Sequence, residues 1–311
     1  MSIANRIAFG ETLVELAKED PTIVVVDSDA RKASGTLVFQ QAFPERFVDV
    51  GIAEQNMVGV AAGLASCGKK VFAATFGVFT SMRAVEQLRN GVCYTSLNVK
   101  IAGTHAGLET GQDGGTHQAI EDIAITRSIP NLRLFVPATP SATRRLTRAA
   151  AALHGPVYLR LGKEPAEELY PDTEDFPVGR SKRLSDGNDA AVIACGNMVV
   201  VALEAAALLK SEGLHVRVID MYSIKPIDED AIEEAARDTR GIVTVEDHSV
   251  IGGLGGAVSE VVTSLRPVTV KRIGLQDRFG RSGTMKGLHA LYGLTAESVV
   301  KAVRELQAGE D

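Results

Sequence analysis

The chain has 311 residues, of which 45% are hydrophobic and 23% charged, an ordinary balance for a globular protein long enough for two domains. The formal net charge of −6 leaves no basic footprint that would favour nucleic-acid binding. No apolar run is long enough to cross a bilayer, so we expect neither nucleic acid nor a membrane as partner.

The cysteines and the first residues indicate the compartment. Cys67, Cys93 and Cys195 are few, scattered and odd in number, and their spacing fits neither a disulfide framework nor a metal site. The opening residues pass directly into an amphipathic helical pattern, without the layout of a signal peptide. We therefore expect a cytoplasmic protein with reduced cysteines and no metal ligands of its own.

Short β-branched runs alternate with helical patterns along the whole chain. Such alternation predicts parallel sheets buried between helices, and so an α/β fold. The predicted strands are 22–26, 47–50, 70–75, 99–103, 132–136, 157–161, 190–194, 215–219, 241–246 and 268–273. The predicted helices include 11–19, 57–67, 139–153, 199–212, 229–238 and 257–265.

A polar stretch rich in chain breakers divides the sequence. Between residues 162 and 187, prolines and glycines stand among many acidic residues, a composition typical of a linker. We therefore expect two consecutive α/β domains with open, mostly parallel sheets. The first spans residues 1–165, the linker 166–184 and the second domain 185–311.

One carboxylate stands between an apolar strand and a helix rich in glycine and alanine. Burying a carboxylate without a partner is costly, so Glu54 in the run Gly51–Met57 needs an explanation. Either it interacts with the free N–H groups of the helix N-terminus, or it is held in a desolvated pocket to hydrogen-bond a heterocyclic nitrogen. In the second case Phe76 and Phe79, which follow in the next strand region, offer a stacking surface.

A second candidate region is the loop 104–118, which follows the predicted strand 99–103 and contains two histidines, an aspartate and four glycines. Open α/β sheets bind ligands at such strand ends. The spacing between His105 and His117 fits no zinc pattern, and no nucleophile-elbow motif is present. General acid–base work and hydroxyl recognition by His105, Asp113 and His117 fit better, while two solvent-exposed loop histidines are the simpler alternative.

The second domain contains a glycine cluster at 252–256, directly after a predicted strand. Its spacing departs from the dinucleotide fingerprint, because Val258 stands where a third glycine is needed. Tight packing of strand against helix is the favoured interpretation, with phosphate binding as the alternative.

Three motifs carry a resemblance to the pyrimidine-binding domain of transketolases. They are Gly51–Met57, Thr75–Phe79 and Gly111–Gln118, and their order and separations also match. Residues 160–163, the linker and residues 185–311 resemble the transketolase C-terminal domain. The resemblance therefore covers essentially the whole chain.

This resemblance implies thiamine diphosphate chemistry. In the family, a glutamate at the place of Glu54 hydrogen-bonds N1′ of the cofactor's aminopyrimidine and promotes formation of the thiazolium ylide. Phe79, with Phe76 nearby, corresponds to the aromatic positions on which the pyrimidine stacks; for Phe76 plain core packing is the alternative. His117, which we count with Glu54 as catalytic, and Asp113 correspond to residues that contact carbonyl and hydroxyl oxygens of the substrate.

The resemblance also implies contacts with the anionic end of the substrate. His105 corresponds to a substrate-binding histidine at the phosphate end. Arg6 and Ser34 stand near positions that hold the sugar phosphate, and Lys163, rather than Arg160, falls closest to the family's phosphate-binding arginine. A lysine holds phosphate as a point charge and not bidentately. Ordinary surface charges and a turn serine would explain the same residues.

Full-length members of the family carry a further α/β domain that binds the diphosphate through Mg²⁺ and contains a Gly-Asp-Gly motif. This sequence has no Gly-Asp-Gly. The resemblance therefore implies the C-terminal subunit of a split transketolase, whose separate N-terminal subunit holds Mg²⁺ and shares thiamine diphosphate with this chain in a heterotetramer. The expected reaction moves a two-carbon ketol unit from a ketose phosphate to an aldose phosphate in carbohydrate metabolism, with pentose phosphates as the default.

Three other functions remain open. An E1 β-like subunit of a 2-oxoacid dehydrogenase would carry an aromatic-His-Ser-Gln loop in place of Gly-Gly-Thr-His-Gln. A fragment like 1-deoxyxylulose-5-phosphate synthase has close motifs but normally belongs to one long chain. A catalytically idle scaffolding or regulatory subunit would keep the fold, and the presence of Glu54, Phe79, Asp113 and His117 speaks against it.

Overall fold

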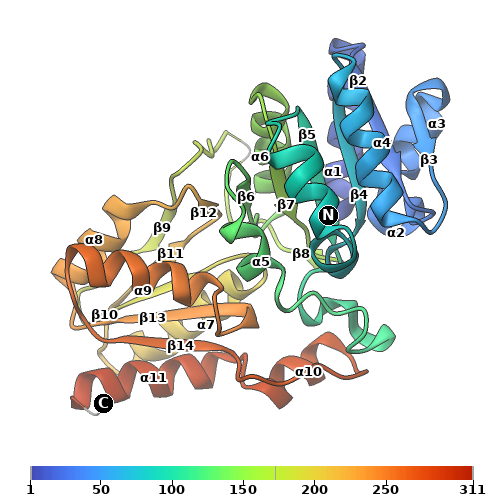
Figure 1. Cartoon of the computed structure of the whole chain (residues 1–311). Helices are drawn as coiled ribbons and strands as arrows, with labels where there is room; N and C mark the ends of the chain where they lie inside the picture. Colours follow the sequence, from blue (N-terminus) through green and yellow to red (C-terminus); the bar gives the residue numbers. More distant parts are fainter. Residues whose placement is uncertain (1, 172, 310–311) are drawn as a thin grey trace.

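The computed structural model describes residues 2–171 and 173–309, so the outermost ends of the two predicted domains and residue 172 of the predicted linker lie outside it. Two α/β halves lie beside each other, one blue to green and the other yellow to red (Figure 1). Parallel pairing dominates both sheets, which confirms the predicted fold class.

The first half is built on one sheet. Its strands are β2 (Ile23–Asp27), β3 (Phe47–Asp49), β4 (Lys70–Phe76), β5 (Val99–Thr104), β6 (Arg133–Phe135), β7 (Val157–Arg160) and β12 (Ser223–Lys225). They pair in the order β12-β6-β7-β5-β4-β2-β3, and only the β12 edge is antiparallel. Strands β2 and β5 are buried along their whole length, as expected for central parallel strands, although β2 ends in Asp27 and β5 contains Lys100.

Helices cover both faces of this sheet. They are α1 (Asn5–Glu19), α2 (Arg31–Ser34), α3 (Leu37–Ala42), α4 (Glu54–Ser66), α5 (Asp122–Ser128) and α6 (Pro140–Ala152). Two π-helical segments follow β4, η2 (Phe79–Arg83) and η3 (Gln87–Cys93), and short 3₁₀ turns lie at η1 (Pro44–Arg46) and η4 (Leu108–Asp113). π-Helical turns are rare in proteins, and those that do occur often lie at functional sites.

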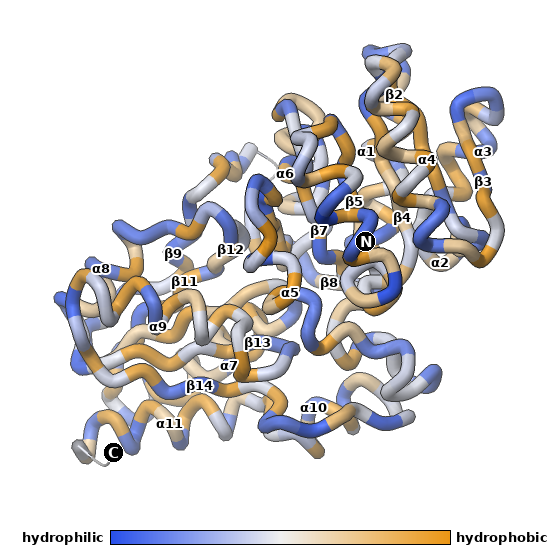
Figure 2. The backbone as a smooth tube through the Cα atoms, viewed as in Figure 1, coloured by the Kyte–Doolittle hydropathy of each residue, from blue (hydrophilic) through white to orange (hydrophobic). Residues whose placement is uncertain are grey.

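The second half repeats this architecture on a smaller scale. Strands β9 (Lys182–Ser185), β10 (Ala190–Ala194), β11 (Val216–Asp220), β13 (Ile242–Ser249) and β14 (Val270–Leu275) pair in the order β14-β13-β10-β11-β9, with β9 antiparallel. The helices are α7 (Met198–Ser211), α8 (Glu229–Asp238), α9 (Leu254–Leu265), α10 (Met285–Tyr292) and α11 (Ala296–Ala308). Hydrophobic positions concentrate along the central strands, and hydrophilic ones in the peripheral loops (Figure 2).

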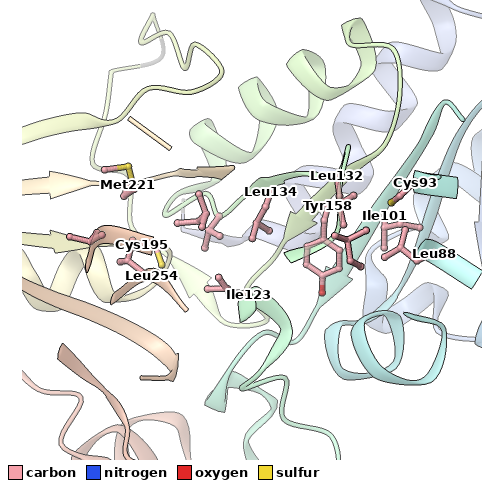
Figure 3. Packing of buried hydrophobic residues seen from close by; sticks show 14 of the residues in the cluster. Leu88, Cys93, Ile101, Ile123, Leu132, Leu134, Tyr158, Cys195, Met221 and Leu254 are labelled. Carbon is pink, nitrogen blue, oxygen red and sulfur yellow. The ribbon is translucent and has the colours of Figure 1, made fainter. Parts of the chain in front are cut away.

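The two halves are joined by more than the connecting segment. Strand β12 comes from the second half of the sequence but pairs with β6 of the first sheet. The two-residue strands β1 (Ile3–Ala4) and β8 (Pro165–Ala166) pair with each other and tie together the start and the end of the first half. One buried apolar cluster runs from Leu88 and Ile101 in the first half to Met221 and Leu254 in the second (Figure 3). The halves therefore share a continuous core.

In the part of the chain that the structure describes, no helix combines the length and the apolar character needed to pass through a bilayer.

Candidate functional site

The carboxyl ends of β4 and β5 bring aromatic rings together. Phe76 ends β4 and pairs in register with Thr104, which ends β5, so His105 directly follows the neighbouring strand. The carboxyl ends of adjacent parallel strands meet at the same edge of a sheet. Here the Phe76 and His105 rings stack, with 4.0 Å between their centroids and 10° between their planes.

Two further rings complete this group. Phe79, at the start of η2, stacks nearly parallel to Phe76 at a centroid distance of 5.7 Å. His117, from the glycine-rich loop, meets the Phe79 ring edge-on at 5.4 Å. We call Phe76, Phe79, His105 and His117 the ring cluster. Phe76, Phe79 and His117 are partly exposed, so the cluster presents aromatic surface rather than being enclosed in the core.

Glu54 lies beside the ring cluster. It is the first residue of α4, and although it is a carboxylate only 3% of it is exposed. Its Oε2 accepts a hydrogen bond from Arg83 Nη1 at 2.9 Å. The Arg83 guanidinium carbon in turn lies 4.3 Å from the centroid of the Phe79 ring. The carboxylate and the aromatic face are therefore neighbours, bridged by one side chain.

Arg83 is the site residue that sequence reasoning missed. It lies four positions after Phe79 in the sequence, and a lone arginine in a helical stretch is an ordinary surface residue by pattern. The segment η2 is π-helical, with the Ala84 N–H bonded to the Phe79 carbonyl at 3.0 Å. This wide turn brings the Arg83 side chain back over Phe79.

Close packing beneath the site depends on glycine. A Cβ at Gly103, in β5, would lie only 2.1 Å from Tyr158 Oη. The buried Tyr158 hydroxyl lies 3.2 Å from Thr80 Oγ1 of η2. Gly103 therefore leaves room for the tyrosine that links β7 to the segment carrying Phe79 and Arg83.

His105 is held in an unusual conformation. Its φ is +57°, in the left-handed region that non-glycine residues seldom adopt, and its Nδ1 lies 3.0 Å from Thr104 Oγ1. Burial lowers the pKa of His105 to about 3, with the positive charges of Arg6 and Lys163 acting in the same direction. The ring is therefore neutral at physiological pH and can exchange hydrogen bonds with a substrate hydroxyl or carbonyl.

The second half of the chain shapes the glycine-rich loop. Gln118 Nε2 donates to the carbonyl of Arg281 at 3.1 Å. A Cβ at Gly114 would lie 2.6 Å from Ser282 Oγ, and one at Gly115 would lie 2.6 Å from the Gly280 carbonyl oxygen. The glycines on both sides thus allow close contact, and the loop that carries His117 is packed against the segment before α10.

Of the residues expected at the substrate phosphate, Arg6 and Lys163 lie near His105, whereas Ser34 is buried and hydrogen-bonded within the fold. Arg6 Nε donates to the Lys163 carbonyl at 3.3 Å, and Lys163 Nζ donates to the Thr110 carbonyl at 3.2 Å. Both positive charges act on His105, so these three groups lie in one electrostatic neighbourhood. Ser34 is fully buried, and its hydroxyl donates to Asp27 Oδ2 at 2.7 Å.

Asp113 and Arg160 lie in contrasting surroundings. Asp113 ends η4 and is exposed. Arg160 is buried: its Nε donates to Asp122 Oδ2 at 2.9 Å, and its Nη2 donates to the Ala119 and Asp247 carbonyls at 3.1 and 2.9 Å. Arg160 therefore serves the junction between the two halves.

The glycine cluster of the second half serves internal packing. The backbone N–H groups of Leu254 and Gly255 donate to the two Glu246 carboxylate oxygens at 2.6 and 2.8 Å. A Cβ at Gly253 would lie 2.0 Å from Glu246 Oε2. An internal carboxylate thus takes the place at the α9 N-terminus that a phosphate would need.

No three histidine, cysteine, aspartate or glutamate side chains converge in an arrangement that could hold a metal ion, within residues 2–171 and 173–309.

Residues 1–167 match the family described as the transketolase pyrimidine binding domain, and residues 179–299 match the transketolase C-terminal domain. The chain belongs to the transketolase family. Together the two matches span the pyrimidine-binding and C-terminal domains of a transketolase.

Relatives of similar length support this placement within the transketolases. A Methanocaldococcus jannaschii protein, provisionally described as a transketolase C-terminal section, is 47% identical over 96% of this chain and 95% of its own length. One of the subunits of the apulose-4-phosphate transketolase of Phocaeicola vulgatus is 40% identical over 97% of each chain. A solved structure described as a split gene transketolase, inactive beta4 tetramer, superimposes with a TM-score of 0.91, at 47% identity and over 100% of both chains.

Membership of the transketolase family implies thiamine diphosphate as cofactor. The geometry fits the pyrimidine end of that molecule. Glu54 and Phe79 already hold the Arg83 guanidinium, a flat group with N–H donors. An aminopyrimidine protonated on a ring nitrogen is also flat and also donates an N–H, so the same carboxylate and ring can accept it.

Proposed function

We propose that this chain is the C-terminal subunit of a split transketolase, which moves a two-carbon ketol unit from a ketose phosphate to an aldose phosphate. The observation that carries the proposal is Glu54, a carboxylate buried next to the ring cluster at the carboxyl edge of the first sheet. The Phocaeicola vulgatus relative is described as one subunit of a transketolase, which supports an enzyme made of two kinds of chain.

Glu54, Phe79 and Phe76 form the cofactor side of the proposed site. Thiamine diphosphate, when bound, supplies a carbon nucleophile that attacks the ketose carbonyl. Glu54 hydrogen-bonds the pyrimidine ring nitrogen, and the low exposure of this carboxyl strengthens that bond by excluding water. Phe79, backed by Phe76, fixes the plane of the pyrimidine by stacking.

The histidines and Asp113 form the substrate side. Because the His105 ring is neutral, it can bind a substrate hydroxyl without adding a positive charge to those of Arg6 and Lys163. His117, half-buried against Phe79, is positioned to exchange a proton with a substrate oxygen as the carbon–carbon bond breaks. Asp113 is exposed at the end of η4 and accepts a hydrogen bond from a sugar hydroxyl.

The positive charges of Arg6 and Lys163 attract the anionic end of the sugar phosphate. Ser34 is less available for binding the phosphate, since its hydroxyl is buried and donates to Asp27. Pentose phosphates are the default substrates, and other sugar phosphates share the required ketose and anionic groups.

A separate N-terminal subunit completes the proposed site. It holds Mg²⁺ and the diphosphate, for which this sequence offers no Gly-Asp-Gly motif. We propose a heterotetramer in the cytoplasm, in which chains of this kind also contact each other. The description of the 47% identical structure as an inactive beta4 tetramer is in keeping with self-association and with the need for a second subunit.

The test is reconstitution with the N-terminal subunit. We expect the purified pair, given thiamine diphosphate and Mg²⁺, to convert xylulose 5-phosphate and ribose 5-phosphate, and Glu54→Ala to abolish turnover without preventing assembly. Glu86→Ala, an exposed acid after η2, is the matched control and keeps full activity. Full activity of Glu54→Ala would remove Glu54 from the mechanism. Turnover of pyruvate with glyceraldehyde 3-phosphate would instead favour 1-deoxyxylulose-5-phosphate synthase chemistry.

A further inference from the structure

Arg83 occupies both of the contacts proposed for the aminopyrimidine. Its Nη1 donates to Glu54 Oε2 at 2.9 Å, and its guanidinium carbon lies over the Phe79 ring at 4.3 Å from the centroid. Planar cationic groups and flat heterocycles use an aromatic face in the same way. One side chain of the protein therefore reproduces the two interactions that define the pyrimidine end of the cofactor site.

The two partners of this contact differ in exposure to solvent. Glu54 is fixed at the start of α4 and its side chain is 3% exposed, whereas the Arg83 side chain is 49% exposed at the end of η2. An arginine with half of its side chain in solvent can turn outward without opening the core. Glu54 cannot move away in the same way, because it is buried.

We propose that Arg83 is an internal stand-in for the aminopyrimidine, which pairs with Glu54 and covers Phe79 in the unloaded chain and swings out when the cofactor binds. The inference rests on the proposed function and adds that Arg83 regulates how readily the cofactor binds. A buried carboxylate without a partner is unfavourable, so the stand-in keeps Glu54 paired while no cofactor is bound.

The stand-in also lowers the apparent affinity for the cofactor. Only the fraction of molecules with Arg83 turned outward is competent to bind, and the apparent dissociation constant rises in inverse proportion to that fraction. Removing the guanidinium makes every molecule competent. A competent fraction near one in ten predicts a roughly tenfold gain in affinity on its removal.

The experiment measures thiamine diphosphate binding by calorimetry, with Mg²⁺, to the complex of this chain with its N-terminal subunit. Arg83→Met keeps roughly the aliphatic part of the side chain without the guanidinium, and we expect it to bind the cofactor roughly tenfold more tightly. Arg83→Lys keeps the charge but not the plane, and falls between Met and the wild type. Arg89→Met, an exposed arginine of η3 bonded to Asn90, is the matched control and leaves the affinity unchanged.

A chemical mimic provides a second measurement. Free guanidinium ion at low millimolar concentration should compete with the cofactor for the Arg83→Met complex and return its apparent affinity towards the wild-type value. The same concentration of sodium chloride should not.

The outcomes separate the two proposals. Normal binding by the wild-type complex together with unchanged or weaker binding by both Arg83 variants overturns the stand-in and leaves the transketolase function intact. Absence of guanidinium competition also counts against it. If neither the wild-type nor the Arg83→Met complex binds thiamine diphosphate, both proposals are wrong.

Discussion

Arg160 Nε lies 2.9 Å from Asp122 Oδ2, and both residues are almost wholly removed from solvent. The Coulombic attraction of Asp122 is strong enough to raise the pKa of Arg160 despite its burial. Arg160 also bonds the Asp247 carbonyl, which belongs to β13 of the second half. The arginine that stood beside Lys163 as a phosphate candidate is thus an internal link between the two halves.

We predict that Arg160→Met lowers the free energy of unfolding by about 3–5 kcal/mol, because it leaves the Asp122 carboxylate buried without its partner. Urea unfolding measures the change. Adding Asp122→Asn to the same chain should recover part of the loss, since the unpaired charge of Asp122 is then removed. An Arg160→Met chain of wild-type stability would contradict the structural role.

The low pKa of His105 predicts a specific acid sensitivity. The folded chain keeps this ring neutral down to a pKa of about 3, while an unfolded histidine accepts its proton near pH 6.5. Stability is therefore lost as the pH falls from about 6.5 towards 3, by at most about 1.4 kcal/mol per pH unit from this residue.

Replacement of His105 tests that assignment. The free energy of unfolding of His105→Asn should fall less steeply than that of the wild type between pH 6.5 and pH 5. His154→Asn, at an exposed position, should follow the wild-type slope. Parallel curves for His105→Asn and the wild type would mean that His105 titrates normally in the folded chain.

The stacking role of Phe79 is tested through cofactor affinity. In the complex with the N-terminal subunit, Phe79→Leu should weaken thiamine diphosphate binding about 3- to 10-fold, because a ring contact contributes about 0.5–1.5 kcal/mol beyond the buried area. Phe43→Leu, which removes a ring packed on Phe39 outside the site, should leave the affinity unchanged. Equal affinities for the Phe79→Leu and wild-type complexes would exclude stacking on this face.

The positive charges near His105 are tested through the substrate. Lys163→Met should raise KM for an aldose phosphate roughly tenfold with little change in kcat, because a charge-assisted contact to the anion is lost. A neutral acceptor such as glycolaldehyde serves as the control and should show an unchanged KM. A lower kcat with both acceptors would point to a different role for Lys163.

Strand cores were predictable because parallel strands are buried on both faces. The predicted strand 190–194 coincides with β10, and the predicted helix 229–238 coincides with α8. The ends of helices and strands were harder to predict where an element begins with polar residues. Helix α4 starts at Glu54, three residues before the predicted start at Met57, because apolar periodicity does not register a polar first turn.

Contacts between distant segments could not be read from the sequence. No local pattern indicates that β12 pairs with β6, or that the Gly280 backbone packs on Gly115. The same holds within the site: the motif gives Glu54 and Phe79, but only the π-helical turn of η2 brings Arg83 over the ring. Irregular backbone and long-range polar contacts leave no periodic signal.

We have proposed that this chain contributes the pyrimidine half of a cofactor site that a second subunit completes. The most direct measurement is a calorimetric titration of thiamine diphosphate with Mg²⁺ into this chain alone, into the N-terminal subunit alone and into their complex. We predict negligible heat of binding with this chain alone and saturable, tight binding with the complex. Tight binding by this chain in the absence of any partner would contradict the account.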